Sequence, residues 1–271
     1  MNHEPLYAWE GRNLLMDTIV HRKRIVSRHD EPIRYCPFDV RRFLMPPEDE
    51  VMGKTWERLA RAHRVSLEHT TGSHRHDIKA KAVWNHVVEH IHYHSEQESH
   101  DRWQFPQETL QLGHGDCEDK SFLCVSLLVA AGIPAHRVRV VVGILASDVQ
   151  SPRNQGHAWP MYRNAHGMWC ILEPNIPHLP VQVRRSASAD IVVPPRAPGI
   201  RRSVFLHADR LATPTSRERY VPLICFNHRS VWTVEPQVTG TVQETERLAP
   251  DWSKNPTFDQ ILKWAARQLK N

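Results

Sequence analysis

The sequence of 271 residues contains no run of about 18 apolar residues, the length that a membrane-spanning helix needs. Its first residues also lack the apolar centre of a secretion signal, because Glu4, Glu10 and Arg12 interrupt them. From these two absences we expect a protein that neither spans a membrane nor is exported, and that has no membrane partner.

Cysteine is scarce, and its spacing is that of neither a disulfide framework nor a metal site. The count of five is odd, which favours reduced thiols over disulfide pairs and predicts a cytoplasmic protein. Three of the five lie inside apolar stretches, where cysteine packs as a small hydrophobic residue. These three are Cys124, Cys170 and Cys225, while Cys36 lies in an expected loop and Cys117 stands apart from both groups.

The excess of one charge sign is also small. The chain has 35 Lys and Arg against 30 Asp and Glu, for a formal net charge of +5. Such an excess predicts mild attraction to acidic partners and does not by itself predict a nucleic-acid binder. The densest basic cluster, His21–Arg24, is short and typical of a solvated face, so we expect no nucleic-acid partner.

One cysteine stands at the start of a long apolar run. Cys117 precedes the stretch Ser121–Ala131, which is too apolar for a surface helix and ends at Gly132. We therefore predict a buried helix with Cys117 in its first turn. The free N–H groups and the positive dipole end of such a turn favour a thiolate, and the same N–H groups can receive an oxyanion.

Two later motifs supply a base and an acid for this thiol. His157 lies 40 residues after Cys117, and Glu173 lies 16 residues after His157. An imidazole can take the thiol proton, and a carboxylate on its other nitrogen holds it in the useful tautomer. A hairpin turn at Asn164–Gly167 would make His157 and Glu173 cross-strand neighbours. The strands that we predict here are Val138–Leu145, His157–Tyr162 and Met168–Leu172.

Taken together, these motifs resemble the transglutaminase-like cysteine hydrolases, and within them the bacterial transglutaminase-like cysteine proteinases. The resemblance covers roughly Asp101 to Asn175. It implies a papain-like α+β core, in which a helix that carries the cysteine packs on an antiparallel sheet that carries the histidine and the acid. It also implies attack on amide or thioester carbonyls through an acyl-enzyme. The residues that carry it are Trp103, Pro106, Leu110, Gly115–Asp119, Ala131–Pro134, Gly156–Trp159 and Trp169–Pro174.

The chain departs from the family pattern at two positions. The acid of the triad is usually Asp, whereas this chain offers Glu173, with Asn175 as a second candidate for orienting the histidine. Pro160 lacks a backbone donor and predicts an edge strand or a bulge near His157.

Acidic residues beside Cys117 work against the helix dipole, because a nearby carboxylate raises the pKa of a thiol. They are Asp116, Glu118 and Asp119, and the cations that could offset them are Lys120, His114, protonated His157 or a bound metal. In the proteinase branch, acidic residues at this place resemble a calcium site. Acidic residues are also favoured in a first helical turn without any metal. We therefore expect no cofactor, with calcium as the alternative.

The second donor to an oxyanion is left open by the sequence. Family members recruit a side chain upstream of the cysteine, and four residues compete for this role. Gln111 has the papain-like spacing, and Trp103, Gln104 and Gln107 are its rivals.

A helix is predicted over Asp77–His94, where apolar residues recur at helical spacing. His86, His90 and His94 share its other face, and histidines four residues apart can bind zinc together. No matching carboxylate or cysteine accompanies them, so we favour a solvated face.

The whole chain is expected to divide into four parts: a helical N-terminal arm (1–70), the transglutaminase-like catalytic core (71–178), a Pro- and Arg-rich loop (179–215) and a C-terminal hairpin with a closing helix (216–271). We predict a cysteine peptidase or amidase, with the triad Cys117, His157 and Glu173, that hydrolyses peptide, isopeptide or other amide bonds of a protein or peptide substrate. The alternatives are amine transfer to protein glutamine and a catalytically idle binding protein. The sequence leaves the oligomeric state open.

Overall fold

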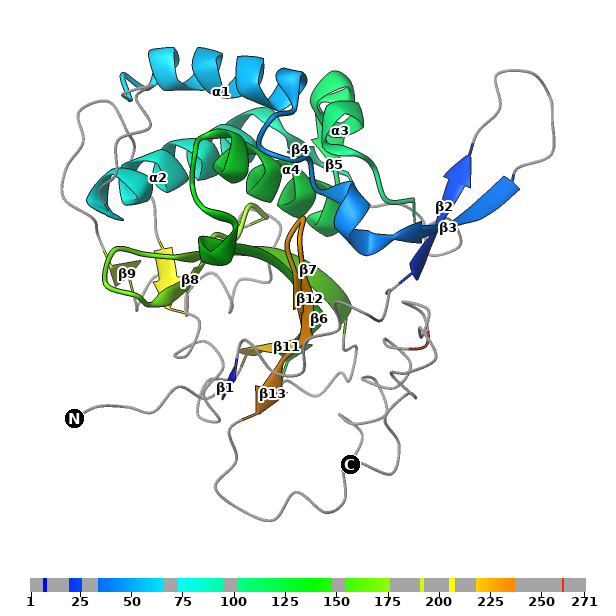
Figure 1. Ribbon diagram of the computed structural model, residues 1–271. Coiled ribbons are helices and arrows are strands. Elements are labelled where there is room, and N and C mark those ends of the chain that lie inside the picture. Colours follow the sequence, from blue (N-terminus) through cyan, green and yellow to red (C-terminus); the bar gives the residue numbers. More distant parts are fainter. Residues whose placement is uncertain are drawn as a thin grey trace.

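Helix α4 (Cys117–Ala130) is the buried element that the apolar run predicts. Every residue from Glu118 to Ala130 is buried, so the helix must be surrounded on all sides. In the computed structural model the other helices pack on one side of α4, and strands of a sheet pack on the other (Figure 1). The helix ends before Gly132, whose positive φ of 82° favours glycine.

The structure describes residues 7–8, 20–25, 34–65, 73–94, 102–147, 155–175, 191–192, 205–207, 218–236 and 260. Three further helices form the layer around α4, and their bounds are α1 (Glu50–Ala62), α2 (Ser73–His90) and α3 (Pro106–Leu112). Asp49 caps α1 by accepting a hydrogen bond from the backbone N–H of Met52 at 2.9 Å.

The sheet under α4 has seven strands in the order β12-β11-β6-β7-β8-β10-β9, and its neighbours pair antiparallel. Chain neighbours β6, β7 and β8 lie side by side at its centre, as the hairpin turn at Asn164–Gly167 predicts. The bounds are β6 (Val138–Ser147), β7 (Gln155–Arg163), β8 (Trp169–Ile171), β9 (Ile191–Val192), β10 (Phe205–His207), β11 (Glu218–Phe226) and β12 (Val231–Thr233).

The two faces of this sheet belong to two hydrophobic clusters. Val140, Val142 and Ala158 join the large cluster that contains the helices. Trp159 and Tyr220 join a smaller cluster with other residues of β6, β7 and β11. Because side chains alternate along a strand, a one-residue step along β7 passes from one cluster to the other. The α+β architecture expected from the sequence is confirmed.

Pro160 does not mark an edge or a bulge, so this prediction is wrong. It lies in β7, which has a partner on both sides, and it pairs with Val140 in an unbroken register. Its carbonyl accepts a hydrogen bond from the N–H of Leu172 at 2.9 Å, just beyond the end of the short strand β8. The missing N–H of proline faces this same side, where the ladder ends, so a central strand tolerates it.

The described residues of the N-terminal arm before Val40 form strands, which corrects the expectation of a helical arm for these residues. Strands β2 (Val20–Ile25) and β3 (Arg34–Asp39) pair antiparallel, and they contain the basic cluster and Cys36. Strand β1 (Tyr7–Ala8) pairs with β13 (Glu235–Pro236) near the other end of the chain.

Three further predicted elements have different outcomes in the structure. The helix predicted to reach His94 ends at His90, and β4 (His92–Tyr93) follows and pairs with β5 (His114–Gly115). The predicted loop 179–215 contributes β9 and β10 to the sheet. The closing helix predicted near the C-terminus lies outside the described residues, apart from the single helical residue Gln260.

Across the described ranges, no helix combines the length and apolar character that crossing a membrane requires. The four cysteines whose side chains are described are all free thiols: Cys117, Cys124, Cys170 and Cys225.

Candidate active site

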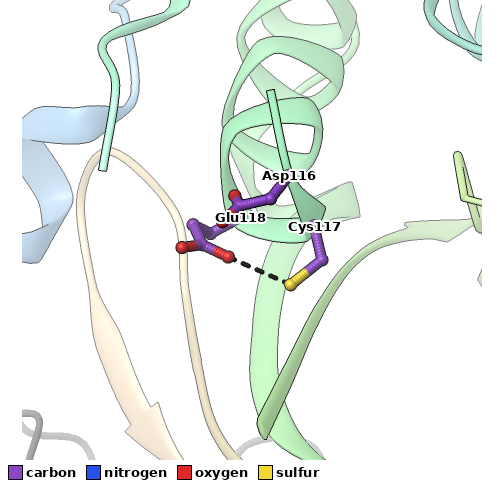
Figure 2. Close-up of side chains that lie close together, drawn as sticks. All are labelled: Asp116, Cys117 and Glu118. Carbon is purple, nitrogen blue, oxygen red and sulfur yellow. Dashed lines mark hydrogen bonds between the residues drawn. The ribbon is translucent and has the colours of Figure 1, made fainter. Parts of the chain in front are cut away.

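Cys117 is the first residue of α4, and its side chain is half-buried. The thiol donates a hydrogen bond to Oε2 of Glu118 at 3.0 Å (Figure 2). The backbone N–H of Ala158, in β7, donates toward the sulfur and lowers its pKa. The start of α4 therefore touches β7 at the residue that follows His157.

The charge around the sulfur favours a thiol over a thiolate. Burial is the largest cause that raises the pKa of Cys117 well above its ordinary value. The negative charges of Glu118 and Asp116 raise it further, as does the hydrogen bond to Glu118. In this arrangement Cys117 is protonated at neutral pH. Asp116 and Glu118 raise the pKa of the thiol, as the sequence predicts.

His157 and Glu173 form a buried pair. Nε2 of His157 lies 2.8 Å from Oε2 of Glu173, and the two side chains are 9% and 0% exposed. β7 and β8 lie side by side, so the hairpin brings the two residues together across 16 positions of the chain. Since Glu173 binds Nε2, Nδ1 is the imidazole nitrogen left to accept a proton from a thiol.

Each of the three oxygen atoms of Glu173 accepts a hydrogen bond. Its Oε1 accepts from the backbone N–H of Asn175 at 2.9 Å, and its Oε2 also accepts from the hydroxyl of Tyr220 at 3.1 Å. Its backbone carbonyl accepts from the indole N–H of Trp84 in α2 at 2.8 Å. A fully buried carboxylate requires such donors, because an unpaired charge in the interior is costly. Asn175 thus contacts Glu173 through its backbone.

Lys120 provides a buried positive charge near this carboxylate. It is 2% exposed, and its Nζ donates to the carbonyl of Ile91 at 2.8 Å. Burial lowers the pKa of Lys120 to about 8, and the negative charge of Glu173 opposes this shift. Below that pH, Lys120 is a cation, and its charge attracts the carboxylate of Glu173. Of the cations that the sequence offered as an offset, Lys120 therefore faces the acid of the pair.

Within the described part of the chain, the thiol of Cys117 and the imidazole of His157 are not hydrogen-bonded to each other. Among the described residues, the thiol donates to Glu118, and His157 stacks on Trp159 and faces Tyr220 instead, with ring centroids 5.8 and 5.9 Å away. The sulfur nevertheless lies against the backbone of the residue next to His157. Catalytic hydrogen bonds are often loose without substrate and tighten when it binds.

Asp119 connects α4 to the segment before α3. Its Oδ1 accepts from the backbone N–H of Gln104 at 2.7 Å, and its Oδ2 accepts from that of Asp116 at 3.3 Å. Gly115 makes room for this side chain, because a Cβ at Gly115 would lie 2.6 Å from the Cβ of Asp119. Asp119 therefore has a structural task that needs no metal.

The four candidates for the second oxyanion donor differ in their surroundings. Gln111 is exposed, and Gln107 donates to Asp49 at the start of α1. Trp103 packs its ring against other aromatic rings of the core. Gln104 is buried, with its backbone bound to Asp119. Burial and this link favour Gln104 over Gln111, the residue with the papain-like spacing.

In the described part of α2, the histidines do not gather into a group of three metal ligands. Among the described residues, the metal-ligating atoms of three side chains gather only at Asp116, Cys117 and Glu118. His86 and His90 stack with ring centroids 4.4 Å apart, and His94 lies beyond the end of the helix. Burial, followed by the charge of His90, lowers the pKa of His86 to about 4. The zinc hypothesis is therefore set aside.

Tyr220 and Gly143 belong to this site, although sequence reasoning did not single them out. Tyr220 lies in the predicted C-terminal hairpin, and only the pairing of β11 with β6 brings it to Glu173. Gly143 pairs with His157 on one side and Pro222 on the other. A lone glycine inside an apolar strand pattern is the one signal that pointed to a close approach here.

The α+β fold, in which a buried helix begins at Cys117 and packs on an antiparallel sheet, is the arrangement that the resemblance to transglutaminase-like hydrolases implies. Residues 63–174 match the family model described as the transglutaminase-like superfamily. The resemblance seen in the sequence motifs is confirmed over this range.

Among solved structures, the chain is similar to LapG of Legionella pneumophila. The two share 19% identity over 78% of this chain and 96% of that chain, with a TM-score of 0.43. An EGTA-treated form of LapG gives 19% identity, 81% and 97% coverage and a TM-score of 0.44. A calcium-bound form of LapG shares 18% identity over 81% of this chain and 99% of that chain, with a TM-score of 0.39. No curated protein matches the chain.

Proposed function

We propose that the protein is a cysteine hydrolase that cleaves amide bonds of a peptide or protein through a thioester. The observation that carries this proposal is the buried His157–Glu173 pair, at 2.8 Å, beside the residue whose N–H touches the sulfur of Cys117. A nucleophile, a base and an orienting acid in this order are the parts that acyl transfer needs.

The chemistry would run in two halves. Nδ1 of His157 takes the thiol proton, and the thiolate of Cys117 adds to the carbonyl carbon to give an oxyanion. The oxyanion collapses, the C–N bond breaks, and the imidazolium gives its proton to the leaving amine. Water, deprotonated by His157, then adds to the thioester and releases the acid and the thiol. Glu173 carries negative charge throughout and stabilises the imidazolium.

The oxyanion would be held at the start of α4. The N–H of Cys117 is one of the first N–H groups of the helix, which have no partner within it. The side chain of Gln104 is the second donor in this proposal, because its segment is fixed to α4 through Asp119. Preorganised donors of this kind lower the barrier most when they are buried.

The competing functions predict different products. A transglutaminase would join an added amine, such as a fluorescent cadaverine, to glutamine in the presence of water, whereas a hydrolase would release the free acid. An idle binding protein would show an ordinary thiol at Cys117. The cytoplasmic location stays a prediction.

The test is selective alkylation of Cys117 by iodoacetamide across pH, with the modified residue mapped by mass spectrometry. We expect Cys117 to react at pH 7 faster than glutathione, because His157 can accept its proton when the thiol turns away from Glu118. His157→Ala should slow this reaction about 10²-fold, the scale of one general base. His90→Ala, which removes an exposed histidine of α2, should leave the rate unchanged. An unchanged rate in His157→Ala would contradict the proposal.

The acidic residues beside Cys117 are candidate ligands for calcium. The ligand atoms of Asp116, Cys117 and Glu118 lie within 4.8 Å of one another. Two carboxylates are hard oxygen ligands that suit calcium, but the ion takes about 6–8 oxygens, so backbone carbonyls and waters would have to supply the rest. The residues thus fit calcium in part. When bound, the ion would neutralise the carboxylates that raise the pKa of the thiol.

This idea makes a prediction about the pH profile of alkylation. Glu118 raises the pKa of Cys117 by its charge and by its hydrogen bond, so Glu118→Gln should lower that pKa and move the alkylation midpoint to lower pH. Calcium should move the wild-type midpoint in the same direction, and EGTA should reverse it. Glu57→Gln, on the exposed side of α1, is the control for both. If calcium has no effect while Glu118→Gln does, the residues hold no calcium.

A further inference from the structure

The site extends beyond the residues that match the transglutaminase-like superfamily. Strand β11 lies outside the matched range 63–174, yet its Tyr220 reaches the acid of the proposed triad. We propose that Tyr220 is a positioning residue that fixes the carboxylate of Glu173 and, through it, the imidazole of His157. This inference rests on the proposed function, because it assigns a role within that site.

The geometry assigns each oxygen of Glu173 a separate task. Oε1 is held by the backbone N–H of Asn175 at 2.9 Å. Oε2 receives both the hydroxyl of Tyr220 at 3.1 Å and Nε2 of His157 at 2.8 Å. Without the hydroxyl of Tyr220, Oε2 would be held only by its bond to His157, which is the side chain that Glu173 must orient. With the hydroxyl, the carboxylate plane is set before His157 is charged, which is the meaning of preorganisation.

The ring of Tyr220 has a task that is distinct from that of its hydroxyl. It is 2% exposed and packs edge-on against Trp159, with centroids 5.1 Å apart. His157 lies parallel to Trp159 at 5.8 Å. The rings of Trp159 and Tyr220 therefore cover His157 on its face of the sheet and exclude water from the His157–Glu173 pair. A phenylalanine at position 220 would keep this wall and remove only the hydrogen bond.

Several titratable groups of the described residues surround Glu173. His157 faces it from β7 and Tyr220 from β11, and Lys120 and Cys124 face it from α4. Of these, His157 and Tyr220 bond directly to the carboxylate, and Lys120 acts through its charge. Removing the hydroxyl leaves the number of formal charges unchanged, so any effect of Tyr220→Phe reports on how the carboxylate is held.

Tyr162 provides a matched control. It is fully buried in β7, and its hydroxyl donates to Oδ1 of Asp77 at 2.7 Å. It therefore has the same type of bond, a buried phenol to a carboxylate, on the face of the sheet that packs on the helices. Tyr162→Phe should cost stability in the same way as Tyr220→Phe, but it should not affect Cys117.

The experiment is a double-mutant cycle on the rate of Cys117 alkylation by iodoacetamide at pH 7. We expect Tyr220→Phe to slow alkylation about 3- to 10-fold, the effect of one lost hydrogen bond of about 0.5–1.5 kcal/mol, and Tyr162→Phe to leave it unchanged. In the Glu173→Gln background, Tyr220→Phe should have no further effect, because it acts through the carboxylate. Equal slowing in both backgrounds, or no slowing in the wild type, overturns the proposal.

A second measurement separates this inference from the proposed function. In Cys117→Ala protein, the NMR signal of the His157 Nε2–H proton reports on its bond to Glu173 whether or not the thiol is reactive. Tyr220→Phe should shift this signal, and Tyr162→Phe should not. If wild-type Cys117 reacts no faster than glutathione but the signal shifts, the positioning role stands and the hydrolase proposal fails. If the signal does not shift, Tyr220 does not position the pair.

Discussion

Replacing Glu173 with glutamine is expected to slow the acylation of Cys117 by about 10²- to 10⁴-fold. Glutamine has the same shape and keeps an oxygen that can accept from Nε2 of His157, so the imidazole stays in place. It lacks the negative charge that stabilises the imidazolium when the thiol proton moves to Nδ1. The measurement is the burst of p-nitrophenol from p-nitrophenyl acetate, followed together with the alkylation rate of Cys117.

The control for this variant is Glu108→Gln. Glu108 accepts from the backbone N–H of Phe105 at 2.6 Å and lies at the start of α3, so it is a carboxylate with a structural bond close to the site. Its glutamine variant should keep the burst within about twofold of the wild type. If Glu173→Gln keeps the burst and Asn175→Ala loses it, then Asn175 orients the histidine and the triad is assigned wrongly.

The buried carboxylate of Glu173 also depends on its surroundings. Because it is 0% exposed, it needs donors and a positive charge nearby to offset the loss of water. Asn175 and Tyr220 supply donors to its oxygens, and Lys120 supplies the charge. The groups that stabilise the acid of the proposed triad therefore come from three separate parts of the sequence.

The parts of the site that follow from local pattern were predictable. The apolar run after Cys117 is a buried helix, and the turn at Asn164–Gly167 joins two central strands, because each signal lies within one or two elements. The neighbourhood of His157 and Glu173 follows from the same hairpin. For these elements, periodicity and turn residues suffice.

The parts that depend on distant pairing were not predictable. Nothing in the residues around Tyr220 shows that β11 pairs with β6, and this pairing alone brings the phenol to Glu173. Pro160 was taken as an edge signal, since the sequence does not show that β8 ends where the missing N–H lies. The direction of the thiol, toward Glu118, likewise depends on how the side chains pack.

Gly143 is the position where these distant pairings meet, and Gly143→Ala is expected to disrupt both the fold and the site. A Cβ there would lie 2.1 Å from the carbonyl oxygen of Val221 and 2.9 Å from both Cα of Pro222 and the ring of Trp159. Two of these neighbours are backbone atoms of β11, so the added methyl group can fit only if the strands separate. We expect a loss of about 1–3 kcal/mol of unfolding free energy, as for other overpacked interiors.

The control is Gly156→Ala, one residue before His157, where a Cβ would meet nothing within 4 Å. The measurements are thermal unfolding and Cys117 alkylation, and both should change in Gly143→Ala and neither in Gly156→Ala. Because β11 carries Tyr220 and β7 carries His157, separating either strand from β6 moves a partner of Glu173 even in molecules that stay folded. Alkylation should therefore fall under conditions where Gly143→Ala is still fully folded, and a stable variant with an unchanged rate would show that the register of β11 does not matter to the thiol.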